Sequence, residues 1–195
     1  MNGVSVIIAT FGENDLYRRL ALRAAASVTQ QTVEPLEVVR VHGDTLQKAR
    51  NEGAELAKGE WLIFLDADDE LDPRYVEAML AAEGDIRRPA TLGIVDGVED
   101  VAPVMIPKRD LLMSNYIVIG AMHRREDFLA VGGFNNYPCL EDWDLWLRIV
   151  YNGAEVVDVP EAVYRVHVIP DSRNSDVSIH AKVYSKIRHQ YRSRR

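Results

Sequence analysis

The chain has 195 residues, of which 47% are hydrophobic and 27% charged, and its formal net charge is −7. This length and composition suit one globular domain, whereas the acidic balance argues against a general nucleic-acid binder, whose surface would be basic. A single cysteine, Cys139, excludes an internal disulfide. The N-terminal segment lacks the pattern of a signal peptide, and no stretch holds the about 20 apolar residues that span a bilayer. We therefore expect a cytoplasmic protein.

Apolar runs alternate with helical patterns along the first third of the chain. The β-branched run Val4–Ala9 predicts a buried strand, and apolar residues recurring through Leu16–Val28 predict a helix. Leu36–Val41 and Trp61–Leu65 predict two further strands, with a helix between them at Thr45–Ala57. This order favours a parallel sheet covered by helices on both faces.

The second half of the chain is less regular. Pro73–Ala82 and Asp142–Val150 predict helices, and Glu155–Val159 predicts a strand. Residues 84–110 contain several glycines and prolines, which predict short strands and turns there.

The tail has its own composition, and it divides the chain into a domain at 1–170 and a basic helical tail at 171–195. One helical stripe is apolar, and the other faces are basic. The stripe is Ile179, Val183, Ile187 and Tyr191, and the basic residues are Lys182, Lys186, Arg188, Arg192, Arg194 and Arg195. One interpretation is a surface helix docked on its own domain or on a second subunit, as in a homodimer. The other is a basic amphipathic helix on an anionic membrane, which would make the protein peripheral at the inner face of that membrane.

Three carboxylates follow the strand at Trp61–Leu65: Asp66, Asp68 and Asp69. Ligands of open α/β sheets bind at the carboxyl ends of strands, and residues two apart on an extended chain point the same way. Asp66 and Asp68 are thus predicted to face one ligand. Neighbouring carboxylates repel unless a cation lies between them, and oxygen ligands suit Mg²⁺ or Mn²⁺ bound to substrate phosphates. The alternative is a polar turn in which Asp68 or Asp69 caps the next helix.

Several short motifs, in this order, resemble the family 2 glycosyltransferases of the GT-A fold. They are Val4–Thr10, Leu36–Val41, Ala49–Gly53, LDADD at 65–69, Gly132-Gly133-Phe134, Glu141–Arg148, Val159-Pro160 and Tyr164–His167. The resemblance implies an α/β fold with a mostly parallel, Rossmann-like sheet flanked by helices, followed by a C-terminal helix. The chain departs from the family after Leu36–Val41, where a usual helix and strand are missing, so we expect a sheet of reduced size.

The resemblance also implies an activity, that of a metal-dependent inverting glycosyltransferase. Such an enzyme moves a sugar from a nucleotide-diphosphate sugar to an acceptor hydroxyl. By this resemblance Asp66, Asp68 and His167 would bind the Mn²⁺ or Mg²⁺ that neutralises the leaving diphosphate. Asp142, next to Glu141, would be the general base that takes the proton of the acceptor hydroxyl.

Further residues are assigned to the substrates by the same resemblance. The donor-binding set is Thr10, Phe11, Glu13, Asp44, Arg50, Asn51, Asp66 and Ala67, and the acceptor region is Gly132, Gly133 and Trp143. A UDP-sugar is the favoured donor, although the acidic turn that reads the base in relatives is here reduced to Asp44. Without a role in substrate binding, the residues after the first strand would form an ordinary turn, Arg50 and Asn51 would be solvated helix residues, and a tryptophan would pack in the core.

Three other functions use the same aspartates differently. A phosphatase of the haloacid dehalogenase class also places Asp-x-Asp after an apolar strand, but normally on its first strand and with Thr or Val where this chain has Asp69. A nucleotidyltransferase would clamp phosphates with Asp66, Asp68 and a metal, and would release pyrophosphate. An inactive sugar- or nucleotide-binding module is the third, and the presence of Asp142 argues against it.

Overall fold

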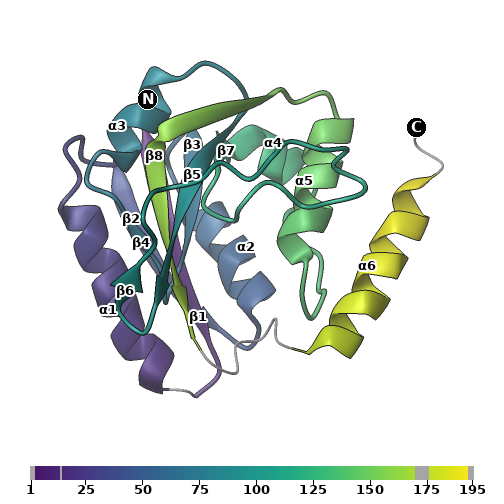
Figure 1. Cartoon of the computed structure of the whole chain (residues 1–195), viewed down its shortest axis with the longest axis horizontal. Coiled ribbons are helices and arrows are strands. Elements are labelled where there is room, and N and C mark those ends of the chain that lie inside the picture. Colours follow the sequence, from purple (N-terminus) through teal and green to yellow (C-terminus); the bar gives the residue numbers. More distant parts are fainter. Residues whose placement is uncertain (1–2, 14, 170–175, 193–195) are drawn as a thin grey trace.

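The computed structural model describes residues 3–13, 15–169 and 176–192, which fold around one mixed sheet of 8 strands (Figure 1). In spatial order the strands are β2 (Glu37–Gly43), β1 (Val4–Phe11), β3 (Trp61–Asp66), β7 (Met122–Arg124), β5 (Ile86–Val95), β8 (Val156–Val168) and β4 (Glu70–Leu71), while β6 (Val98–Glu99) pairs with β5. The long pairings, β1 with β2 and β3 and β5 with β8, are parallel. The short strands pair antiparallel. The expected mostly parallel sheet is confirmed.

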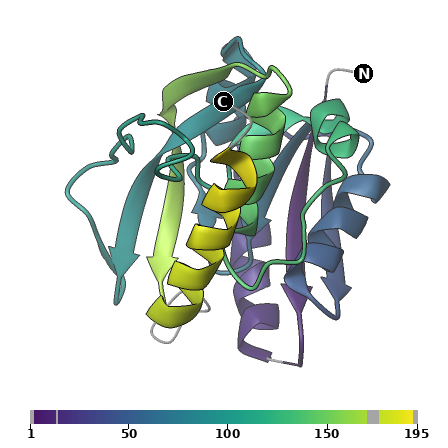
Figure 2. The ribbon, with the colours of Figure 1, turned by 90° about the vertical axis from the view of Figure 1, so that its right-hand side faces the viewer.

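Helices cover both faces of this sheet, as Figure 1 shows. One face carries α1 (Asp15–Thr29) and α3 (Tyr75–Ala81), and the other carries α2 (Leu46–Leu56), α4 (Arg125–Ala130) and α5 (Glu141–Tyr151). The C-terminal helix α6 (Val177–Tyr191) lies along the outer side of α5 (Figure 2). The resulting layers are those that the alternation of apolar runs predicts.

An aromatic cluster joins β3 to α4, to α5 and to the loop between these two helices. The Phe64 ring centroid lies 5.3 Å from that of Phe128 and 5.0 Å from that of Phe134. The buried His123 ring packs edge-on against Trp146 at 5.1 Å, and burial lowers the pKa of His123 to about 4. His123 is therefore a neutral core residue, and the cluster fixes the loop of Phe134 against β3.

For residues 84–110 we expected short strands and turns, and this prediction was wrong for the beginning of the segment. β5 runs through ten residues, Ile86–Val95, and β8 is longer than the predicted Glu155–Val159. Each strand contains a proline, but the register shifts between Pro89 and Ala90, where Pro89 is opposite Val159 and Ala90 is opposite Val163. This bulge accommodates residues that cannot donate to the ladder, so the prolines do not end the strands.

The apolar stripe of α6 faces the protein's own domain, as the docked-helix interpretation predicted. Val183, Ile187 and Tyr191 are buried, while Ile179 at the start of the stripe stays 41% exposed. Arg194, Arg195 and the boundary at 170/171 lie outside the described residues. Over the ranges that the structure describes, no helix combines the length and apolarity needed to cross a membrane.

Candidate active site

The carboxyl ends of four strands meet at one edge of the sheet. In the parallel register Ala9 lies beside Asp66 and Thr10 beside His42. β8 is parallel to β5, and β5 is antiparallel to β7, which is antiparallel to β3. The end of β8, with His167, therefore points to the same edge, and the fold brings these predicted residues to one place.

The aspartates after β3 form a tight turn that leads the chain back into β4. The backbone N–H of Asp69 donates to the carbonyl of Asp66 at 3.1 Å. One carboxylate oxygen from each of Asp66, Asp68 and Asp69 lies within 4.8 Å of the others. The expected juxtaposition is present, but it arises from this turn and not from an extended chain. The turn also adds Asp69, which the sequence suggested only as a helix cap.

Contacts from β8 hold this acidic turn. Asp69 is 6% exposed and accepts the backbone N–H of His167 at 2.9 Å, while the Asp66 N–H donates to the Tyr164 hydroxyl at 3.1 Å. The His167 ring lies with Nε2 2.7 Å from Glu70 Oε1. His167 therefore borders the cluster through its backbone, and the compact group of potential ligands found in the described part of the chain consists of the three aspartates.

The electrostatics of the turn suit a cation. Burial and the charge of Asp66 raise the pKa of Asp68 to about 6, and burial together with Asp66 and Asp68 raises the pKa of Asp69. Carboxylates that repel one another in this way are stabilised by a divalent ion, and an all-oxygen donor set matches the preference of Mg²⁺ and Mn²⁺. The three residues thus fit a metal of this kind.

A buried arginine connects the acidic turn to the start of α5. Arg50 on α2 is 2% exposed. Its Nη2 pairs with Asp66, and its Nη1 donates to Glu141 Oε1 at 2.8 Å. Glu141 and the adjacent Asp142 therefore lie on the same side of the molecule as the acidic turn.

Asp142 has the properties of a proton acceptor. Its Oδ2 accepts a hydrogen bond from Asn115 Nδ2 at 2.9 Å. Burial and the charge of Glu141 raise its pKa to about 6. A carboxylate with this pKa is mostly ionised at neutral pH yet binds a proton more readily than an exposed aspartate.

The end of β1 borders a pocket of about 480 Å³ between α1 and β2. Its polar rim is Thr10, Arg18, Arg40 and His42, and Thr10 Oγ1 lies 3.0 Å from His42 Nδ1. The sequence reasoning had assigned Thr10 but missed the other three. The alternation of β2, which sends Arg40 and His42 to the exposed face, is the signal that could have found two of them.

Other predicted donor residues lie near this edge in different environments. Phe11 at the end of β1 and Glu13 just after this strand are exposed, and Ala67 is buried in the acidic turn. Asp44 is exposed and pairs with Lys48 at 3.3 Å. The chain passes from β2 at the sheet edge directly into α2, in agreement with the expected missing helix and strand.

Asn51 and the two glycines shape the loop before α5. Asn51 donates to the carbonyl of Phe134 at 3.0 Å and accepts its N–H at 2.8 Å. Gly132 and Gly133 have φ of 79° and 69°, values that only glycine adopts readily. The Asn51 amide is thus engaged with the loop backbone.

The assignment of Trp143 to the acceptor region is corrected by its burial. Trp143 is 1% exposed and Trp146 0%. The Trp143 indole donates to the carbonyl of Leu111 at 2.6 Å, and its ring stacks on Tyr184 of α6 at 5.0 Å. Trp143 is buried because α6 covers the outer side of α5, whereas Trp146 packs inward against His123.

Comparison with known proteins agrees with the motifs. The family model described as glycosyl transferase family 2 matches residues 38–134. An uncharacterized glycosyltransferase of Haemophilus influenzae is 28% identical over 186 residues, covering 84% of this chain and 62% of that protein. A PGL/p-HBAD biosynthesis glycosyltransferase of Mycobacterium tuberculosis is 33% identical over 131 residues, covering 60% of this chain and 49% of that protein.

Among solved structures, S. aureus TarS 1-349 in complex with UDP-GlcNAc superposes with a TM-score of 0.71 at 14% identity. The superposition covers 95% of this chain and 64% of TarS 1-349, so this chain spans less than two thirds of the length of these relatives. The family match, the motifs and the named relatives establish that the chain belongs to glycosyl transferase family 2, and the likeness to TarS shows that its fold is GT-A.

Proposed function

We propose that the chain transfers a sugar from a nucleotide-diphosphate sugar to an acceptor hydroxyl, with inversion at the anomeric carbon. The observation that carries this proposal is the Arg50 bridge, which pairs with Asp66 of the acidic turn and with Glu141, the neighbour of Asp142. The acidic turn that would hold the diphosphate and the metal thus adjoins a carboxylate with a raised pKa. Sugar transfer with a general base requires these two parts side by side.

In this mechanism the acidic turn holds the donor. Asp66 and Asp68 would ligate Mg²⁺ or Mn²⁺, with Asp69 as a candidate third ligand. The metal, when bound, would supply positive charge that neutralises the leaving diphosphate. Arg50 keeps Asp66 oriented and compensates its charge, and Thr10 and His42 border the pocket proposed for the nucleoside.

Asp142 would act on the acceptor. Asn115 fixes Oδ2, so the acceptor hydroxyl would approach Oδ1 and give up its proton there as its oxygen attacks the anomeric carbon. The bond to the diphosphate breaks on the opposite face of the sugar, in a transition state resembling an oxocarbenium ion. General base assistance of this kind contributes on the order of 10²–10⁴-fold.

A UDP-sugar is the donor to test first, because TarS was crystallised with UDP-GlcNAc. The phosphatase and nucleotidyltransferase alternatives lose support, since the matched family and the named relatives are glycosyltransferases.

The exposed basic side of α6 is a second element of the proposal. Lys182, Lys186 and Arg192 are exposed, while the apolar stripe of the helix, except for Ile179, is already buried in its own domain. Contact with an anionic membrane would therefore be electrostatic, and each basic residue would contribute about 1 kcal/mol. Co-sedimentation with phosphatidylserine vesicles, lost in K182E/K186E, is the expected result. Equal sedimentation of both proteins would contradict this contact.

The experiment that tests the activity is a screen of UDP-, GDP- and dTDP-sugars with Mn²⁺, Mg²⁺ or EDTA. We expect slow release of nucleoside diphosphate from one donor class, dependent on metal and equal in Asp96→Asn, a control at an exposed turn. Release of pyrophosphate would indicate the nucleotidyltransferase, and phosphate release from a generic ester would indicate the phosphatase. Absence of nucleotide binding in the presence of metal would contradict the proposal.

A further inference from the structure

The loop at residues 131–140 leads directly into the helix that carries Asp142, and it ends in an unusual conformation. Leu140, immediately before α5, has φ 58° and gives the helix no side-chain cap. A non-glycine residue in this region costs roughly 1–2 kcal/mol. The first turn of α5 is therefore held by contacts of the loop with neighbouring elements.

Two helices on the inner side supply part of these contacts. From α2, Asn51 binds both backbone groups of Phe134, and Gln47 donates to the carbonyl of Tyr137 at 2.5 Å. From α5, Arg148 donates to the carbonyl of Val131 at 2.7 Å. These bonds fix the loop at its start and in its middle.

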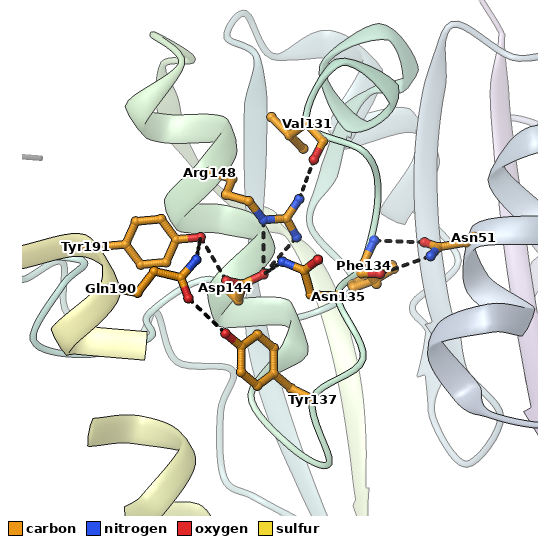
Figure 3. Close-up of polar contacts among 9 residues, drawn as sticks. All are labelled: Asn51, Val131, Phe134, Asn135, Tyr137, Asp144, Arg148, Gln190 and Tyr191. Atoms are coloured by element: carbon orange, nitrogen blue, oxygen red, sulfur yellow. Dashed lines mark hydrogen bonds and ion pairs between the residues drawn. The ribbon is translucent and has the colours of Figure 1, made fainter. Parts of the chain in front are cut away.

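The outer side of the loop is held by a buried carboxylate and by α6 (Figure 3). Asp144 is 0% exposed. Its Oδ2 accepts from Asn135 at 2.9 Å and from Arg148 at 2.8 Å, and its Oδ1 accepts from the Tyr191 hydroxyl at 2.9 Å. Three residues thus compensate one buried charge through four hydrogen bonds, and such a set is destabilised strongly when one donor is removed.

Tyr191 and its neighbour Gln190 give α6 two attachments. Burial and the charge of Asp144 raise the pKa of Tyr191, so its hydroxyl stays protonated and donates. Gln190 Oε1 accepts from the Tyr137 hydroxyl at 3.0 Å, and Figure 3 shows both side chains reaching from α6 toward the loop and α5. The helix therefore bonds to the loop directly through Tyr137 and indirectly through Asp144.

We propose that α6 is a positioning element for the proposed general base. Tyr191, through Asp144, and Gln190, through Tyr137, fix the loop at 131–140 and with it the first turn of α5, where Asp142 lies. This assignment rests on the proposed function for the role of Asp142. It gives a positioning task to a helix outside the segment that the family model matches, 38–134.

Hydrogen exchange of the full chain tests this positioning without any substrate. In Tyr191→Phe the ring stays and only the hydroxyl is removed. The matched control is Tyr75→Phe, which removes another buried hydroxyl, bonded at 2.8 Å to the carbonyl of Gly120. We expect amides of residues 132–142 to exchange about tenfold faster in Tyr191→Phe than in the parent, and unchanged in the control. Gln190→Ala should give a smaller increase confined to the same segment.

The kinetic arm uses UDP-GlcNAc with Mn²⁺ and measures release of UDP. Tyr191→Phe should lower kcat about tenfold and leave KM for the donor unchanged, because Tyr191 bonds to Asp144 on α5, whereas the acidic turn after β3 would hold the donor. Tyr75→Phe should keep both parameters. Exchange rates at 132–142 that match those of the Tyr75→Phe control would overturn the positioning role. If the parent releases nucleoside diphosphate from none of the donors in the screen, the proposed function fails, while the exchange measurement still decides whether α6 fixes the loop.

Discussion

Removing the Arg50 guanidinium should destabilise the protein more than any surface charge change. Arg50→Met keeps most of the side-chain volume and leaves two carboxylates without their cation. The Glu141 side chain is 2% exposed and that of Asp66 is 31% exposed. Breaking a buried pair by removing one partner costs about 3–5 kcal/mol. Because water screens Asp66 in part, we expect a loss of about 3–4 kcal/mol, or about 10 °C in Tm for a chain of this size.

Urea unfolding followed by tryptophan fluorescence measures this loss, since all 3 tryptophans are buried. Arg18→Met is the matched control, because Arg18 is 56% exposed and its ion pair with Asp15 is long, at 3.9 Å. Its free energy of unfolding should change by about 0.5 kcal/mol or less. Adding Glu141→Gln to Arg50→Met should recover part of the loss, because it removes the buried charge that Arg50 compensates. A change below about 1 kcal/mol in Arg50→Met would refute the buried bridge.

Three further predictions concern the base, the loop and the metal. Because the pKa of Asp142 is about 6, kcat/KM for transfer should be level above that pH and fall about tenfold per unit below it; a rate independent of pH between 4 and 7 would contradict this. Gly133→Ala should cost at least about 1 kcal/mol more in urea unfolding than Gly132→Ala. Both have positive φ, but only a Cβ at Gly133 would lie 2.6 Å from a side-chain oxygen; equal losses would exclude that clash. Asp68→Asn should weaken Mn²⁺ binding about tenfold or more in calorimetry with the metal alone, and unchanged affinity would remove Asp68 from the ligand set.

The layers of the fold could be predicted because their signals are local. β1, β3 and α2 follow from short apolar runs and helical spacing. β5 and β8 could not be predicted in full, since the bulge that accommodates Pro89 and Pro160 depends on the pairing between two strands far apart in the sequence. When the partner strand is unknown, a single proline predicts the end of a strand.

The candidate site also has residues that could be predicted from the sequence and contacts that could not. Asp66, Asp68 and Asp142 lie in motifs with fixed spacing, so the sequence and the resemblance suggested them together. The bridge through Arg50 depends on how α2 and α5 pack, and no spacing encodes it. Asn115 comes from an irregular segment whose place beside Asp142 only the fold determines.

The burial of Trp143 could not be predicted for a related reason. Its exposure depends on whether α6 covers α5, and an amphipathic helix alone does not reveal what its apolar stripe contacts.

The most direct test of the central claim compares the parent with Asp142→Asn, a nearly isosteric change, on a donor found by the screen. Equilibrium binding of the donor with Mn²⁺ and the rate of transfer to a hydroxyl acceptor are measured for both proteins. The account predicts equal donor affinity and a transfer rate at least about 10²-fold lower in the variant. Transfer at the parental rate in Asp142→Asn would contradict the assignment of this carboxylate as the base.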